Sequence, residues 1–260
     1  MQLIFNFIAK LGRYTQEQIA KIGEITVFAS RAVFHCFHSP FYLRLIFSQM
    51  LRIGYFSLPV VGLTAIFSGA VLALQSYSGF SRFNAESTIA TVVVLSITRE
   101  LGPVLAGLMV AGRVGASIAA EIATMRVTEQ IDALRTLSTN PFKYLIVPRL
   151  IASVLVLPIL VLIADIIGVM GGYLVSVHSL GFSAGPYIAN TFKFLEFIDV
   201  VSGLVKASCF GFLIAVMGCY FGYYSNRGAE GVGNATTNAV VSSSIFILLS
   251  NYLITFIFFG

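Results

Sequence analysis

The sequence is poor in charge. Only 10% of its 260 residues are Asp, Glu, Lys or Arg, whereas 57% are apolar, and the mean hydropathy is +0.91. A soluble domain normally carries about 25% charged residues. So few charges cannot cover a water-soluble globule of this size, which excludes cytosolic enzymes, secreted disulfide scaffolds and disordered tails. The composition indicates an integral membrane protein.

Signatures of catalysis and metal binding are also scarce. Cys36, Cys209 and Cys219 form no spaced pattern, and the two that lie in apolar runs, Cys209 and Cys219, are predicted to be small core residues. The absence of any Gly-Lys dipeptide excludes a G-x-x-x-x-G-K-S/T phosphate loop. His35 and His38 have no acidic or thiol partner nearby in sequence, so a helix face explains them better than a metal site. We therefore expect no catalytic residue, metal or cofactor on this chain.

Five stretches are apolar and long enough to cross a bilayer, which takes a helix of about 20 residues. They are residues 53–77, 88–112, 150–177, 200–224 and 239–259. The first and last carry no charge, whereas the other three contain Arg99 and Glu100, Asp165, and Lys206 respectively. The sequence thus predicts an all-α integral membrane protein with five transmembrane helices. The glycine cluster at 228–233, before the last span, is predicted to be a flexible turn.

The N-terminal region, residues 1–50, has a different pattern. Its polar side chains recur mostly every three or four residues, which places them on one stripe of a helix. They are Asn6, Lys10, Arg13, Glu17, Lys21, Glu24, Arg31, His35 and His38. This pattern predicts an amphipathic helix lying in the membrane interface. A sixth span at 22–37 is the competing interpretation, but it would place Glu24, Arg31 and His35 in lipid.

The net charge of +5 reflects membrane topology and does not indicate a nucleic-acid partner. Segments 1–52, 113–149 and 225–238 hold twelve of the sixteen Lys and Arg residues, whereas the two loops on the other side hold two. Because cytoplasmic loops carry an excess of Lys and Arg, the N-terminus is predicted to be cytoplasmic and the C-terminus periplasmic.

Arg99 and Glu100 lie about 17 Å into their span, near the middle of the bilayer. Ionisable groups are costly there and usually pair or line a cavity. Because the two residues are about 100° apart on one helix, they need not pair with each other. Pro103 is predicted to kink the helix. A structural ion pair, a polar lining to a substrate cavity and a proton relay all remain open, and Asp165 could pair with Lys206 across two helices.

Small residues form a ridge within the fourth predicted span. They recur every fourth position at Gly203, Ala207, Gly211 and Ala215, and Gly168 and Gly172 repeat this spacing in the third span. Such ridges let membrane helices approach closely. We predict packing within one chain, with a subunit interface as the alternative.

The predicted cytoplasmic loop 121–149 contains a short amphipathic pattern. One helix face carries Val127, Ile131 and Leu134, and the other carries Glu129, Asp132 and Thr136. The Asn140-Pro141 pair is predicted to end this helix. Such a helix can rest on the membrane or present its polar face to a cytoplasmic partner, and we favour the partner.

Several motifs resemble the MlaE/YrbE permease family, from about residue 45 to 260. They are Arg99-Glu100-Leu101-Gly102-Pro103-Val104, Ala111-Gly112-Arg113-Val114-Gly115, Ala120-Glu121-Ile122, Met125-Arg126-Val127-Thr128-Glu129-Gln130-Ile131-Asp132-Ala133-Leu134, Asn140-Pro141, Pro148-Arg149, and Tyr223-Tyr224 with Gly228-Ala229-Glu230-Gly231-Val232-Gly233-Asn234-Ala235-Thr236-Thr237. The sequence departs from the family at Asn234 and Asn238, where Arg is common, at Asn251, where Asp is common, and at Ala123, which replaces Gly. The resemblance implies a permease domain over residues 51–260.

The resemblance further implies a permease subunit of an ABC transporter that moves phospholipids between the inner and outer membranes of a bacterium. Such permeases are homodimers in the inner membrane. They work with a cytosolic ATPase that uses ATP and with a periplasmic MCE-domain lipid-binding protein. By this resemblance, Met125–Leu134 is the coupling helix that contacts the ATPase, and Arg99 and Glu100 border the lipid cavity.

Two other functions remain open. A proton-coupled secondary transporter could use Glu100 and Asp165, but it would need inverted repeats, and five spans divide poorly into two halves. A membrane anchor without transport activity would have little use for charge at mid-bilayer.

Overall fold

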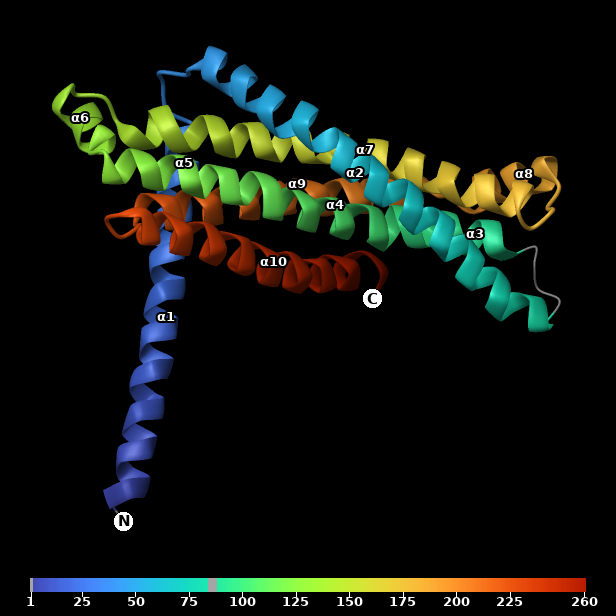
Figure 1. Ribbon diagram of the computed structural model, residues 1–260, viewed down its shortest axis with the longest axis horizontal. Helices are drawn as coiled ribbons and strands as arrows, with labels where there is room; N and C mark the ends of the chain where they lie inside the picture. The colour runs from blue at the N-terminus through green and yellow to red at the C-terminus, as the bar shows by residue number, and fades with distance from the viewer. Residues whose placement is uncertain (1, 84–87) are drawn as a thin grey trace.

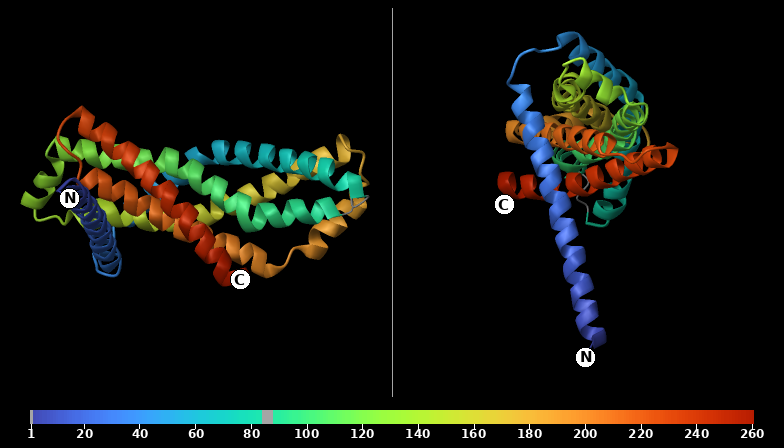
Figure 2. Two further views of the ribbon diagram at one scale, coloured as in Figure 1. Left: turned by 90° about the horizontal axis from the view of Figure 1, so that it is seen from below. Right: turned by 90° about the vertical axis from the view of Figure 1, so that its left-hand side faces the viewer.

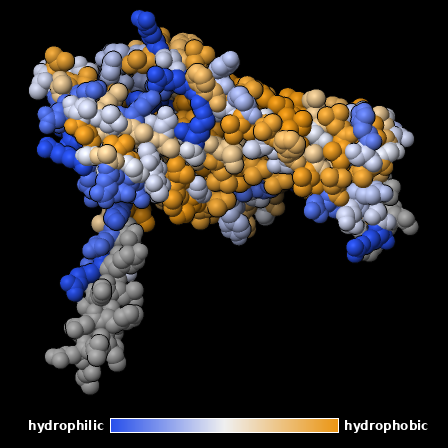
Figure 3. Space-filling model, viewed as in Figure 1, coloured by the Kyte–Doolittle hydropathy of each residue, from blue (hydrophilic) through white to orange (hydrophobic). Residues whose placement is uncertain are grey.

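The computed structural model describes residues 2–83 and 88–260, and every element in those ranges is helical (Figure 1). Five helices are long and apolar enough to cross a membrane. Their middle forms an apolar belt on the face seen in Figure 3, with polar surface towards both ends of the bundle. The prediction of an all-α membrane protein with five spans is therefore confirmed.

Each spanning helix begins or ends outside the stretch predicted from hydropathy. The first is α2 (Leu43–Phe80), and the second is a continuous helix built from α3 (Ile89–Ser96), η3 (Ile97–Leu101), α4 (Gly102–Val110), η4 (Ala111–Gly115) and α5 (Ala116–Val127). The third comprises η5 (Phe142–Ile146) and α7 (Val147–His178), and the last two are α9 (Phe197–Tyr223) and α10 (Ala229–Phe259). Shorter elements are η1 (Ser81–Phe83), α6 (Gln130–Thr136) and α8 (Ala184–Phe194).

The glycine cluster at 228–233 is not the flexible turn that the sequence predicts. Gly228 has a φ of +91° and caps α10, and the residues after it are already helical. Glycine tolerates this left-handed conformation without steric cost, so it can turn the chain sharply into the helix. As a result α10 starts ten residues before the predicted span, at Ala229.

Three of the described helical segments, η3, η4 and η5, are π turns. Pro103 is the second residue of α4, two positions after the end of η3. Because proline has no N–H and clashes with the preceding turn, the helix accommodates it by widening there. Single π turns of this kind are often found at functional sites. Here η3 holds Arg99 and Glu100, and η4 holds Arg113.

Small residues let the spanning helices meet at their backbones. A Cβ atom placed on Gly69 of α2 would lie 1.9 Å from the carbonyl oxygen of Gly168 in α7. On α9, a Cβ at Gly203 would lie 2.7 Å from the carbonyl oxygen of Thr98, and one at Gly211 would lie 2.5 Å from that of Ser153. The predicted packing of these ridges within one chain is confirmed.

The N-terminal helix α1 (Gln2–Cys36) crosses the bundle at the end where α5 meets α6, and its first half projects away (Figures 1 and 2). Its second half docks through Phe28, whose buried ring contacts Phe142 and Tyr220. The Tyr220 hydroxyl donates to the Glu24 carboxylate at 2.9 Å. Within the described ranges, the five membrane-crossing candidates do not include α1.

The two faces of α1 differ in what they contact. Glu24 and His35 of the polar stripe lie against the bundle, and His35 Nε2 is 3.0 Å from Asn140 Nδ2. The opposite face exposes the apolar side chains Ile19, Ile22, Val33, Phe34 and Phe37. An outward apolar face is what a helix in the membrane interface needs, and that location stays a prediction.

Candidate functional site

A cluster of charged side chains joins three of the spanning helices. Its centre is η3, from which Arg99 and Glu100 reach different partners on α9. The Nε of Arg99 donates to Asp199 Oδ1 at 2.7 Å, and the Nζ of Lys206 donates to Glu100 Oε1 at 2.8 Å. The same Nζ also donates to the Arg99 carbonyl oxygen at 2.6 Å. Arg99 and Glu100 therefore pair with α9 and not with each other, as their angular separation allows.

Helix α10 completes the cluster with neutral groups. Asn251 Nδ2 donates to Glu100 Oε2, and Thr255 Oγ1 donates to Glu100 Oε1, each at 2.8 Å. The Phe259 ring centroid lies 4.3 Å from the guanidinium carbon of Arg99. The last span thus contributes an amide, a hydroxyl and an aromatic ring, and its asparagine contacts the carboxylate without adding charge.

Asp199 is held in place by the start of α9. It forms a capping box with Glu196, whose backbone N–H donates to Asp199 Oδ2 at 3.0 Å. A carboxylate is also favoured in the first turn of a helix, where the backbone N–H groups and the helix dipole stabilise negative charge. Asp199 was not predicted as a site residue from the sequence, because it lies one position before the predicted fourth span. The spacing of Glu196 and Asp199 is the sequence feature that could have indicated the capping box.

Exposure divides the cluster into two halves. The side chains of Asp199 and Lys206 are 0% exposed, whereas those of Arg99 and Glu100 are 33% and 38% exposed. Because two cations face two carboxylates, the cluster is balanced in charge. Its accessible half presents a guanidinium beside a carboxylate. The cluster lies near the C-terminal end of α10, which is part-way along the bundle in Figures 1 and 2.

The anticipated pairing of Asp165 with Lys206 is wrong. Lys206 is occupied by Glu100, and Asp165 packs against the backbone of the second span. A Cβ atom on Gly102 would lie 1.8 Å from Asp165 Oδ1, so only glycine leaves room for this carboxyl group. The two helices α7 and α9 do contact each other, but their charged side chains point to different neighbours.

The segment Met125–Leu134 is not one helix. Met125, Arg126 and Val127 form the last turn of α5, Thr128 and Glu129 form a turn, and α6 starts at Gln130. Glu129 has a φ of +59°, which breaks the helix between the two parts. Helix α6 ends at Thr136, before Asn140, whose Oδ1 instead accepts from the N–H of Phe142 at 2.9 Å. The Asn140-Pro141 pair therefore begins the next helix.

Helix α6 is amphipathic, as its sequence predicts. Ile131 is completely buried and Leu134 is half-buried, whereas Asp132 and Ala133 are exposed. The neighbouring Leu137 is 74% exposed. The exposed Leu137 beside the polar face of α6 forms a surface that can contact another protein.

Two polar contacts hold α6 against the bundle, and a third, longer one lies at its start. Arg126 Nη1 lies 3.0 Å from Asp132 Oδ1, and Arg135 donates to the hydroxyl of Tyr223 on α9. Glu129 lies 3.9 Å from Arg227, and both side chains are largely exposed. The helix is thus attached to α5 and α9 while its outer face remains open.

Comparison with known proteins identifies the family. The model of the family described as Permease MlaE matches residues 46–257. A probable ABC transporter permease protein of Rickettsia conorii is 64% identical over 257 residues, 99% of each chain. A further probable ABC transporter permease, from Synechocystis, is 42% identical over 81% of this chain and 80% of its own length.

A plant relative is also similar. The Arabidopsis thaliana chloroplastic protein named TRIGALACTOSYLDIACYLGLYCEROL 1 is 36% identical over 90% of this chain and 67% of its own length. The family match includes the charged cluster and the segment Met125–Leu134. ABC permeases work with a partner ATPase subunit, so an ATPase is implied here. The chain belongs to the MlaE family of ABC transporter permeases.

Proposed function

We propose that this permease moves phospholipids between the inner and outer membranes of a bacterium, driven by ATP hydrolysis on its partner ATPase. The accessible half of the charged cluster carries this proposal. A guanidinium binds phosphate and a carboxylate binds ammonium, so Arg99 beside Glu100 complements both charged groups of a zwitterionic headgroup. The name of the Arabidopsis relative, which is that of a diacylglycerol lipid, supports the same class of substrate.

We further propose that two copies of the chain enclose the lipid cavity. Only 11% of the apolar window of α10 is buried, compared with 50–56% for the second, third and fourth spans. Its uncovered side chains include Ile245, Leu249, Tyr252 and Phe256. A second copy packed on α10 would bring two charged clusters to a shared cavity. The family assignment favours an ABC permease function over that of a proton-coupled transporter or a membrane anchor.

The proposed orientation follows the distribution of Lys and Arg. In the inner membrane, the end with α6 would face the cytoplasm and the end with α8 would face the periplasm. The ATPase would then contact Met125–Leu134, and an MCE-domain lipid-binding protein would receive or supply lipid at the α8 end. The exposed face of α6, together with Leu137, supports the ATPase contact.

Neutralising one ion pair as a unit tests the lipid cavity. The double variant Glu100→Gln/Lys206→Met removes both charges, so neither is left buried without a partner. We expect normal assembly with transfer of labelled phospholipid between reconstituted vesicles slowed at least about tenfold, since a charged hydrogen bond to the headgroup is lost. Glu230→Gln, at an exposed carboxylate on the first turn of α10, is the control. Wild-type transfer by a stably folded double variant would contradict the proposal.

Charge reversal tests the ATPase contact. Glu129→Lys changes an exposed side chain whose ion pair with Arg227 is long, so the permease should fold normally. We expect less ATPase to co-purify with this variant. The control is Glu17→Lys, an equal change at an exposed position of α1. Normal ATPase recovery with Glu129→Lys, or an equal loss with Glu17→Lys, would argue against this contact.

A further inference from the structure

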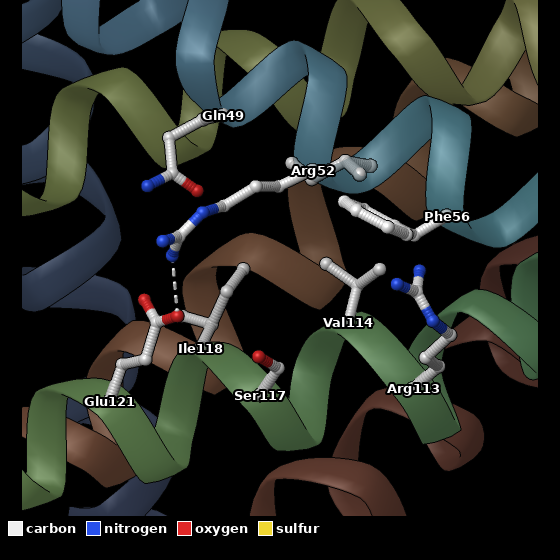
Figure 4. A pocket seen from close by; sticks show the side chains of 9 residues that line it. Gln49, Arg52, Phe56, Arg113, Val114, Ser117, Ile118 and Glu121 are labelled. Carbon is white, nitrogen blue, oxygen red and sulfur yellow. Dashed lines mark hydrogen bonds and ion pairs between the residues drawn. The ribbon is translucent and has the colours of Figure 1, made fainter.

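A cavity of about 440 Å³ lies between α2 and the η4–α5 segment, remote from the charged cluster (Figure 4). Its walls include Arg52 and Phe56 from α2, and Arg113, Ser117 and Glu121 from the facing helix. Figure 4 shows Arg52 reaching across to Glu121, with Ser117 between Glu121 and Arg113 along the lower wall. Cavities of about 300–1,000 Å³ are typical of small-molecule sites.

Positive charge is in excess around this cavity. Glu121 is shared by two cations, since its Oε1 is 2.8 Å from Arg52 Nη1 and its Oε2 is 2.9 Å from Arg149 Nη2. Arg113 donates to a neutral partner, the Ser57 hydroxyl, at 2.6 Å. In the described part of the chain, no carboxylate lies within ion-pair distance of Arg113. Arg52 and Arg113 line the cavity, and the carboxylate in its wall, Glu121, is already paired with Arg52 and with the buried Arg149. The resulting excess of positive charge favours an anion in the cavity.

The depth of the cavity corresponds to a lipid headgroup layer. Arg113 follows Ile89 by 24 residues and Arg52 precedes Phe80 by 28, so they lie about 36 and 42 Å from the outer ends of their helices. The hydrocarbon core of a bilayer is about 30 Å thick, and the whole bilayer is about 40–45 Å thick. With the outer helix ends at one boundary of the core, and with an ordinary helix tilt, both guanidinium groups reach the opposite headgroup layer.

An apolar stripe on α2 leads from the cavity towards the outer end of the helix. It consists of Phe56, Val60, Leu63, Phe67 and Leu74, which follow helical spacing and are 43–62% exposed. Phe56 also lies beside Arg113, whose guanidinium carbon is 5.7 Å from its ring centroid. The stripe offers an acyl chain a surface that begins where the positive charge ends. A free inorganic anion has no apolar part that could contact this stripe.

We propose that this cavity binds the phosphate of an anionic phospholipid from the cytoplasmic leaflet, with one acyl chain lying along the α2 stripe. Arg113 binds the phosphate directly, because its guanidinium has no carboxylate partner among the residues that the structure describes. Arg52 closes the rim while it is held by Glu121. This site is additional to the proposed transport cavity, and a lipid bound here need not be transported.

Lipid binding to the full-length permease in detergent tests the site by native mass spectrometry, with phosphatidylglycerol and phosphatidylcholine as probes. We expect stronger binding of phosphatidylglycerol. Arg113→Gln removes the charge, and Ser117→Phe fills the cavity without changing any charge, so each should weaken phosphatidylglycerol binding at least about tenfold. Arg44→Gln removes an exposed cation from the same end of α2, outside the cavity, and should have little effect.

Several outcomes would overturn the proposal. An equal loss with Arg44→Gln would mean general electrostatic attraction, and equal binding of phosphatidylcholine would remove the preference for anionic lipid. Displacement of phosphatidylglycerol by millimolar inorganic phosphate would indicate a site for a free anion. If Arg113→Gln fails to fold, Ser117→Phe and Arg113→Lys keep the test valid, with each unfolding midpoint measured without lipid. Unchanged binding by a folded Ser117→Phe would exclude the cavity.

Discussion

Two arginines on one continuous helix, Arg99 and Arg113, sit in π turns fourteen residues apart and have opposite surroundings. Around Arg99, two cations and two carboxylates form a balanced cluster in which Lys206 and Asp199 are completely buried. Around Arg113, the protein leaves an excess of positive charge beside an open cavity.

At the bilayer depths that we propose for these two regions, their difference follows from what surrounds the helix. Within the hydrocarbon layer no solvent can compensate a charge, so an ionisable group needs a partner from the protein or a bound ligand. In the headgroup layer, water and lipid phosphates supply counter-charges. The same residue type can therefore be neutralised internally at one depth and available to a ligand at the other.

The largest expected effect comes from breaking the balanced cluster. Lys206→Met leaves Glu100, among the described residues, with the neutral donors Asn251 and Thr255 alone. We expect a loss of about 3–5 kcal/mol in the free energy of unfolding. Adding Glu100→Gln should recover most of this loss, because it removes the uncompensated charge. Unfolding by denaturant in detergent micelles measures both variants. A loss below about 1 kcal/mol for Lys206→Met would show that the cluster is hydrated.

A smaller effect is expected from removing the single carboxylate at the cavity. Glu121→Gln takes the partner from Arg149, whose side chain is 6% exposed, and from Arg52, which is 59% exposed. Because solvent reaches half of this arrangement, we expect a loss of about 1–3 kcal/mol in the same assay. Glu230→Gln is the matched control. A loss of stability as large as that of Lys206→Met would mean that solvent is excluded from the two regions to the same extent.

The smallest expected loss of stability comes from removing the exposed cation that pairs with Glu121. Arg52→Gln removes an exposed partner from Glu121, which keeps Arg149, so the stability should change by less than about 1 kcal/mol. Raising the salt concentration should reduce even this difference, since exposed pairs are screened. The Lys206→Met difference should be almost independent of salt. Comparing both variants at low and high salt distinguishes an exposed pair from a buried one.

Hydropathy predicted the number of spans because each span must present about 20 apolar residues to lipid. It misplaced helix ends because backbone hydrogen bonding continues beyond the hydrocarbon layer, as in α2, which starts ten residues before the predicted span. The pattern of α6 was predicted correctly on Ile131 and Asp132. The break at Glu129 was not, since a left-handed residue other than glycine leaves little sequence signal.

Sequence alone therefore determined that the chain has five membrane-spanning helices and that α1 does not resemble a sixth span, and it predicted that Arg99 and Glu100 lie near the middle of the bilayer. Only the tertiary structure decided their partners. Lys206 contacts Glu100 and not Asp165 because the rotation and packing of α9 direct its side chain towards η3. Periodicity fixes which residues share one helix face, but the faces that meet depend on how small residues such as Gly203 and Gly211 let the helices approach.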